Sequence, residues 1–178
     1  MKKLITVLLF FTTTLIFSQS TVWSAFTDSV VSYSSPRAVD LNNDGIKDVV
    51  IGAGKEGQQT NFGILAFNGA NGSLLWSVPA RNEVFSSPQF QDITNDNIPD
   101  VFIGGRDAQF YAINGANGNI IWQFFPHNNL NPNDSGWYNF YSAQFIPDMN
   151  ADGKPDLLLA NGGDRKSTRL NSSHITIS

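Results

Sequence analysis

The chain has 178 residues, which is enough for one medium-sized domain with a real hydrophobic core. It contains no cysteine, which excludes a disulfide framework and thiolate chemistry. The net charge of −4 and the lack of a basic patch argue against a general nucleic-acid binder.

Residues 1–20 have the pattern of a secretory signal peptide. Lys2 and Lys3 precede an apolar, threonine-bearing core, residues 4–17, and small residues follow at Ser18 and Ser20. The apolar core is shorter than the roughly 20 apolar residues that span a bilayer, which argues against a membrane anchor. We expect no membrane insertion after the signal peptide is cleaved. No cysteine follows the core, which excludes a lipid-modified lipoprotein. We therefore expect a mature protein that is secreted or displayed at the cell surface.

A repeat occupies the rest of the chain, residues 21–163. The segment "SSPRAVDLNNDGIKDVVIGAG" (34–54) aligns with "SSPQFQDITNDNIPDVFIGGR" (86–106), and "YSAQFIPDMNADGKPDLLLANGG" (141–163) follows the same course. The leading aspartates of the three acidic stretches are 52 and 56 residues apart. A second landmark, "FNGANGSLLW" (67–76), returns as "INGANGNIIW" (113–122).

Each repeat is expected to contain four short strands. In the first repeat they fall near 35–39, 48–53, 63–67 and 73–78, in segments rich in Val, Ile, Phe and Trp. Asn-Gly-Ala-Asn-Gly predicts a hairpin between the last two strands, because Asn and Gly tolerate positive φ. Four strands in roughly 50 residues predict an all-β fold built from β-propeller blades, here about three blades of an incomplete ring.

The segment "TVWSAF" (21–26) is similar to the last strand of each repeat, "LLWSVP" (74–79) and "IIWQFF" (120–125). We expect it to be a lone fourth strand of the kind that closes a propeller ring, with a disordered leader or an edge strand as the alternatives. Trp23, Trp76 and Trp122 recur at one repeat position, so we expect them to be core residues.

The acidic nonapeptides place oxygen atoms at alternate positions around a sharp turn, a pattern typical of a calcium loop. Nine of the fourteen acidic residues of 21–163 lie in these stretches, against six Lys or Arg in the whole segment, so its net charge is −8. Clustered carboxylates repel one another unless a cation neutralises them, and calcium accepts six to eight oxygen ligands in flexible geometry. An Asx turn without metal remains the alternative, above all for the second loop.

The candidate Ca²⁺ ligands are the side-chain oxygens at positions 1, 3, 5 and 9 of each loop and the backbone carbonyl at position 7. They are Asp40, Asn42, Asp44, Ile46 and Asp48 in the first loop; Asp92, Thr94, Asp96, Ile98 and Asp100 in the second; and Asp148, Asn150, Asp152, Lys154 and Asp156 in the third.

These repeats resemble FG-GAP or VCBS-type repeats, the calcium-loop blades of integrin-like β-propellers. The resemblance rests on "DLNNDGIKDVVIGAG", "DITNDNIPDVFIGG" and "DMNADGKPDLLLANGG" and covers 21–163. The "NGANGxLLW" part also resembles quinoprotein-type propeller repeats. Membership would imply about seven blades, calcium between strands, and placement outside the cell. The departures are Asn97, where the pattern has glycine, and the truncated third repeat.

No catalytic constellation is evident in the sequence: His127 is the only histidine before residue 164, and Glu56 and Glu83 look isolated. We therefore expect a binding or adhesion scaffold rather than an enzyme. The alternative is part of an extracellular enzyme, a polysaccharide lyase, a hydrolase or a quinoprotein-like protein, with its catalytic residues elsewhere. Trp137 and Tyr138 are speculative ligand-binding residues that could stack on a sugar, although packing between blades is the interpretation that we favour for them. The expected partner is a carbohydrate or protein at the cell surface.

Residues 164–178, "DRKSTRLNSSHITIS", break the acidic, aromatic and glycine-rich character of the preceding chain. They resemble a translated sequencing-library adapter. We expect this segment to be disordered and unrelated to the fold, and the natural sequence to continue differently after Gly163.

Overall fold

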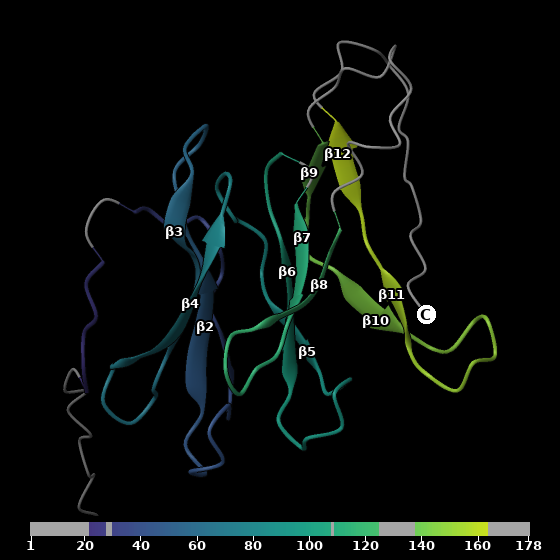
Figure 1. The fold of residues 1–178 in the computed structure, drawn as a ribbon, viewed down its shortest axis with the longest axis horizontal. Coiled ribbons are helices and arrows are strands. Elements are labelled where there is room, and N and C mark those ends of the chain that lie inside the picture. Colours follow the sequence, from purple (N-terminus) through teal and green to yellow (C-terminus); the bar gives the residue numbers. More distant parts are fainter. Residues whose placement is uncertain (1–21, 28–29, 108, 125–137, 164–178) are drawn as a thin grey trace, which may run out of the picture.

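The computed structural model describes residues 22–27, 30–107, 109–124 and 138–163. Its twelve strands form antiparallel sheets (Figure 1). The signal-peptide prediction (1–20), Trp137 and the adapter-like segment (164–178) lie outside the described residues. Within the described part, no helix is long and apolar enough to cross a membrane.

Blade one is a four-stranded meander of β1 (Arg37–Val39), β2 (Asp48–Gly52), β3 (Thr60–Phe67) and β4 (Leu74–Ala80), hydrogen-bonded in chain order. Blade two repeats it with β5 (Gln89–Gln91), β6 (Asp100–Gly104), β7 (Phe110–Ile113) and β8 (Ile120–Phe124). These bounds confirm the four strands expected from the repeat. Both blades carry a register shift next to the Asn-Gly turn that joins their last two strands.

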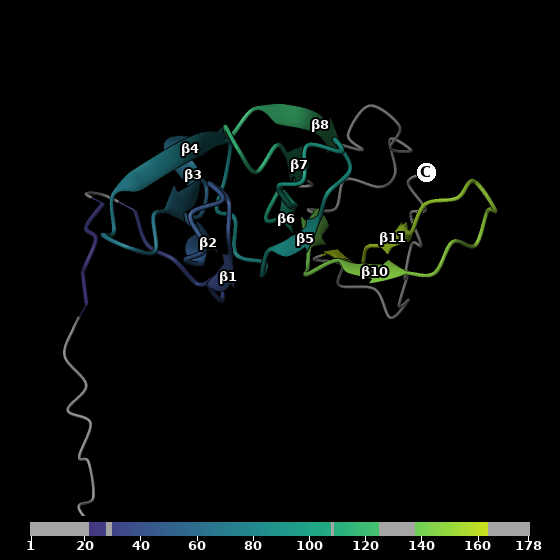
Figure 2. The same ribbon diagram turned by 90° about the horizontal axis from the view of Figure 1, so that it is seen from below.

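The third repeat forms two shorter pairs. Strands β10 (Gln144–Ile146) and β11 (Asp156–Leu158) correspond to the first two strands of a blade, and β12 (Asn161–Gly163) pairs with β9 (Tyr138–Phe140). The three units lie next to one another (Figures 1 and 2). The all-β fold of incomplete propeller blades is therefore confirmed.

In blade two, both faces of the inner strands β6 and β7 are buried, and because successive side chains of a strand point to opposite sides of the sheet, alternate residues pack against different neighbours. In β7, Tyr111 and Ile113 belong to the core shared with blade one, whereas Phe110 and Ala112 belong to the core shared with the third unit. In a third, smaller cluster, the half-buried Trp23 packs against the outer face of blade one, where Leu65 of β3 is buried. Consecutive residues of one strand thus pack against two different units, and this packing holds the units next to one another.

The segment 22–27 is not a strand, contrary to the expectation for "TVWSAF". It nevertheless places Trp23 against the hairpin turn of blade one, where the indole Nε1 donates a hydrogen bond to the carbonyl oxygen of Gly69 at 2.7 Å. In the same way, the indole Nε1 of Trp76 in β4 donates a hydrogen bond to the carbonyl oxygen of Gly115 in blade two at 2.8 Å. Trp76 is therefore a core residue between two blades, as expected from its repeat position, whereas Trp23 and Trp122 are half-buried and pack at the edges of two other core clusters.

Candidate functional site

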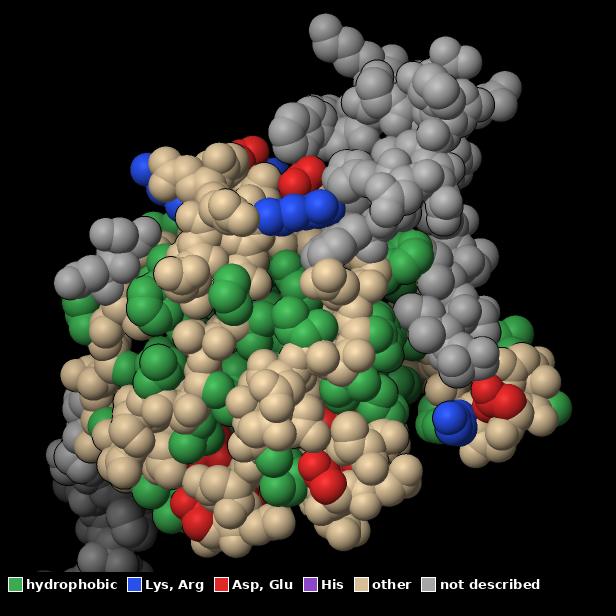
Figure 3. All heavy atoms as spheres, in the orientation of Figure 1, with side chains coloured by type: hydrophobic (Ala, Val, Ile, Leu, Met, Phe, Trp, Pro, Cys, Tyr) green, Lys and Arg blue, Asp and Glu red, His purple; other side chains and the backbone are tan. Residues whose placement is uncertain are grey.

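The three acidic loops connect the first two strands of each unit, and in blades one and two they lie along the lower edge in Figure 3. They share one backbone conformation. The fourth position has positive φ in each loop, 58° at Asn43, 60° at Asn95 and 63° at Ala151. The sixth position repeats the feature, with 82° at Gly45, 66° at Asn97 and 87° at Gly153. Asn97 therefore adopts the left-handed conformation that glycine adopts in the other two loops.

The first aspartate of each loop closes the turn onto its own backbone. One carboxylate oxygen accepts the N–H of the sixth residue, at 3.0 Å for Asp40, 3.0 Å for Asp92 and 2.7 Å for Asp148. For Asp148, the hydrogen bond from Gly153 and those from other loop N–H groups outweigh desolvation and lower the pKa of the carboxyl group. For Asp40, desolvation raises the pKa, but the combined backbone hydrogen bonds, led by that from Gly45, leave it below its ordinary value.

In the first and third loops the third and fifth positions form Asx turns, in which each side-chain oxygen accepts a backbone N–H two residues further on; in the second loop only the fifth position, Asp96, does so. Asn42 accepts from Asp44 at 3.0 Å, and Asp44 accepts from Ile46 at 2.7 Å. The third loop repeats both bonds. The second loop differs, because Asp96 also accepts the Nδ2 group of Asn114 at 3.1 Å. Its backbone bond from Ile98, together with this side-chain bond, lowers the pKa of Asp96 against the opposing effect of desolvation.

The ninth position has a role that the sequence analysis did not foresee. Asp48, Asp100 and Asp156 are fully buried. Asp48 Oδ2 accepts the N–H of Leu41 at 2.8 Å, and Oδ1 accepts the N–H of Gly69, in the hairpin turn, at 2.9 Å. These carboxylates therefore tie the acidic loop to the hairpin turn of the same blade. The recurrence of Asn-Gly at one offset from the loop was the sequence signal that could have indicated this pairing.

Blade two has the same arrangement. Asp100 Oδ2 accepts the N–H groups of Ile93 and Thr94, at 2.8 and 3.0 Å, and Oδ1 accepts that of Gly115 at 3.2 Å. In the third unit Asp156 Oδ2 accepts the N–H of Met149 at 2.6 Å, but its buried Oδ1 has no hydrogen-bond partner. The third unit therefore reproduces half of the pattern.

In the described part of the chain, basic side chains do not neutralise the negative charge of the loops. Among the described residues, no Lys or Arg forms an ion pair with a carboxylate of the three loops. In the same part of the chain, no three His, Cys, Asp or Glu side chains are grouped closely enough to hold a metal ion by themselves. A cation at these loops would therefore have to draw on Asn42, Asn150 and backbone carbonyl oxygens as well as on carboxylates. Such a set of hard oxygen donors suits calcium, and it would be poor for zinc.

A second polar cluster lies at the opposite ends of the strands and was missed from the sequence. Glu83 and Glu56 are not isolated: Arg106 Nε lies 2.7 Å from Glu83 Oε2, and Arg106 Nη1 lies 3.3 Å from Glu56 Oε1. The hydrogen bond to Glu83 raises the pKa of Arg106. Glu83 is 2 % exposed, and its Oε1 has no hydrogen-bond partner. These residues border an open cavity of about 590 Å³ together with Tyr33 and Tyr141.

Tyr138 belongs to β9, but its side chain lies outside the described part, as does all of Trp137. Their suggested role in sugar binding therefore stays a prediction.

Repeated four-stranded antiparallel sheets, packed face to face and each joined internally by the same loop-to-turn hydrogen bonds in both complete blades, define a β-propeller. The chain matches the FAM234A/B beta-propeller family over residues 23–174, and it belongs to that family. The matched range extends past Gly163 into the adapter-like segment. No curated protein matches the chain.

Proposed function

We propose that this chain is a secreted β-propeller that binds calcium in its acidic loops and serves as a binding or adhesion scaffold. We also propose that its acidic loops are of the FG-GAP or VCBS type. Secretion is inferred from the signal-peptide pattern of residues 1–20.

The observation that supports calcium best is the concentration of unpaired charge. In the first loop Asp40, Asn42 and Asp44 present side-chain oxygens within one tight turn, and each oxygen retains a lone pair beyond the hydrogen bond that it accepts. These residues and the carbonyl group of Ile46 would hold the ion. Bound calcium would supply positive charge and fix the loop, while the buried Asp48 anchors the loop from inside the blade.

The test is thermal unfolding of the full chain in EDTA and in calcium. Ligand binding to the folded state alone stabilises it by RT ln(1 + [L]/Kd), about 2.7 kcal/mol at a hundredfold excess over Kd. Extracellular calcium modules have Kd values of about 10⁻⁴ to 10⁻³ M, so 10–100 mM calcium should raise Tm by several degrees. Asp44→Ala should abolish one class of site in calorimetry and leave the others. Identical melting curves with and without calcium would contradict the proposal.

The scaffold role is supported by the cavity at the ends of the strands opposite the acidic loops. It combines exposed aromatic side chains, Tyr33 and Tyr141, with the charged pair Glu83–Arg106, a mixture that can accept sugar hydroxyls or a polar peptide. Screening the full chain on a glycan array and against extracellular-matrix proteins tests this role, with Tyr141→Ala as the variant that should lose binding.

The alternative, a propeller within an extracellular enzyme, is favoured by one observation: the unpartnered Oε1 of buried Glu83 in that cavity. Turnover of a polysaccharide by the full chain, lost in Glu83→Gln, would support it over the scaffold.

A further inference from the structure

The ion pair between Glu83 and Arg106 is a feature of blade two that the repeat itself does not require. In every unit, the residue nine positions before the first loop aspartate pairs through its backbone with the residue six positions after the buried aspartate. These pairs are Val31 with Gly54, Glu83 with Arg106, and Asn139 with Gly162. Only blade two places opposite charges across this contact, and blade two lies between the other two units (Figures 1 and 2). The pair therefore has a role other than holding the fold of the repeat.

Both members of the pair have hydrogen-bonding groups left over. Glu83 is 2 % exposed; its Oε2 accepts the Nε–H of Arg106, whereas its Oε1 has no partner. Arg106 also reaches Glu56 through Nη1, and no described residue accepts a hydrogen bond from its Nη2. A buried carboxylate oxygen without a donor is costly, so a bound group that donates to it is favoured. A hydroxyl group both donates and accepts, and it can therefore satisfy Glu83 and Arg106 together.

Aromatic side chains from consecutive units border the same space, which we call the Arg106 cavity. Tyr33, Phe85 and Tyr141 occupy one repeat position, seven residues before the first loop aspartate. The Arg106 guanidinium carbon lies 5.7 Å from the centroid of the Phe85 ring, and the Phe85 and Tyr141 rings meet edge to face with centroids 5.6 Å apart. Phe85 and the two carboxylates thus fix the guanidinium group, while Tyr141, 49 % exposed, offers a ring to a ligand.

The charges that border the Arg106 cavity cancel. Lys55 and Arg106 supply two positive charges, and Glu56 and Glu83 supply two negative charges. A ligand with a net charge would gain little attraction here and would lose its hydration. The cavity volume of about 590 Å³ is within the range of small-molecule sites. Size, charge and lining together favour a neutral ligand that has hydroxyl groups and an apolar face, which is the chemistry of a neutral pyranose sugar.

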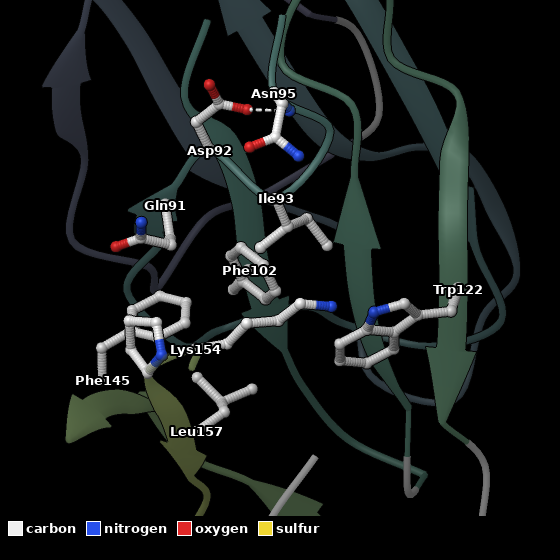
Figure 4. Close-up of a pocket in the computed structure, with 10 residues that line it drawn as sticks. Gln91, Asp92, Ile93, Asn95, Phe102, Trp122, Phe145, Lys154 and Leu157 are labelled. Carbon is white, nitrogen blue, oxygen red and sulfur yellow. Dashed lines mark hydrogen bonds between the residues drawn. The ribbon is translucent and has the colours of Figure 1, made fainter. Parts of the chain in front are cut away.

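The hollow between blade two and the β10–β11 pair, shown in Figure 4, has a different character. Phe102, Trp122 and Phe145 border it, and their rings pack on one another. The ring centroids of Phe102 and Phe145 are 4.9 Å apart, and those of Phe102 and Trp122 are 5.9 Å apart. That hollow continues the core between the two units. The Arg106 cavity instead joins a buried charged pair to an exposed aromatic ring, which makes it the better candidate for binding a ligand.

We propose that the Arg106 cavity binds a neutral sugar. One sugar hydroxyl accepts a hydrogen bond from Arg106 Nη2 and donates one to Glu83 Oε1, and the pyranose ring packs on the exposed ring of Tyr141. This inference rests on the proposed scaffold role and narrows it to one class of ligand. Because the cavity and the acidic loops lie at opposite ends of the strands, sugar binding does not require calcium.

The test is calorimetric titration of the full chain with hexasaccharides. The neutral probes are hexamers of glucose, mannose, galactose and xylose, and the charged probes are hexamers of galacturonic acid and glucosamine. We expect saturable binding of at least one neutral probe, equal in EDTA and in calcium, and at least tenfold weaker binding of both charged probes. Failure of every neutral probe, or equal binding of a charged one, would overturn the inference. Binding of an extracellular-matrix protein alone would also overturn it and would leave the scaffold role standing.

Two protein variants locate the contact. The double variant Glu83→Val, Arg106→Gly gives blade two the residues of blade one, so the backbone contact is kept and no buried charge is orphaned. It should still unfold cooperatively, and its sugar affinity should fall at least tenfold. Tyr141→Ala should also weaken binding about tenfold, and it serves alone if the double variant fails to fold. The control is Phe62→Ala, an exposed aromatic residue outside the cavity, which should bind normally. Unchanged affinity in the double variant or in Tyr141→Ala would overturn the assignment.

Discussion

The buried aspartates at the ninth loop position should be more important for stability than the exposed acids that form the rest of the loop. In Asp48→Ala the N–H groups of Leu41 and Gly69 lose an ionised acceptor at 2.8 and 2.9 Å inside the blade. A hydrogen bond to a charged group contributes about 1.5–3 kcal/mol, and an orphaned buried donor retains its desolvation cost. Two such bonds give an expected loss of about 3–6 kcal/mol.

The matched control is Asp44→Ala in the same loop. Asp44 is exposed and accepts one N–H, that of Ile46. Its removal in EDTA should cost about 1 kcal/mol or less. Urea unfolding of the full chain, followed by tryptophan fluorescence in EDTA, measures both values without a contribution from calcium. If Asp48→Ala costs no more than Asp44→Ala, the buried carboxylate does not hold the loop to the turn, and our account of the blade is wrong.

Three further predictions concern other parts of the structure. Gly115→Ala should lower Tm strongly, because the new Cβ would lie 2.0 Å from a backbone carbonyl oxygen, whereas Gly153→Ala has open space and should cost only about 1 kcal/mol for its positive φ. The pKa of Asp148 is below its ordinary value of 3.8 in the folded state, so its stabilising effect is present above pH 4 and is lost as the pH falls through the lowered pKa. Urea unfolding between pH 2.5 and 6 should show a weaker acid dependence for Asp148→Asn than for the unaltered chain. Arg106→Ala should destabilise the protein by about 3–5 kcal/mol, because it leaves the buried carboxylate of Glu83 unpaired, and Glu83→Gln in the same chain should recover part of that loss.

Local patterns made the blade architecture predictable from the sequence. The 52- and 56-residue spacing and the Asn-Gly turns predicted four strands per unit, and the observed strands β1 to β4 agree within a few residues. The positive φ of Asn97 also follows from a local rule, since asparagine tolerates the left-handed region.

Contacts between distant residues were not predictable in the same way. The bond from the Trp76 indole to Gly115 joins residues 39 apart, and the bond from Gly69 to Asp48 joins residues 21 apart. Both depend on how strands and blades are placed against one another, which hydrophobic periodicity does not encode. For the same reason Asp48 was predicted as one more Ca²⁺ ligand and its burial was not foreseen, and Glu83 looked isolated, although Arg106 reaches it from a neighbouring strand connection.

The double attachment of the turn glycine restricts how such a protein can change its length. Because the aspartate comes from one repeat and the tryptophan from the repeat before it, duplication or deletion of a whole repeat brings together the same pair of residues at every new junction. An insertion or deletion of part of a repeat instead separates a donor from its acceptor at the junction. Recombination in the gene should therefore be tolerated in steps of one full unit, and changes in length by part of a unit should be removed by selection for folding.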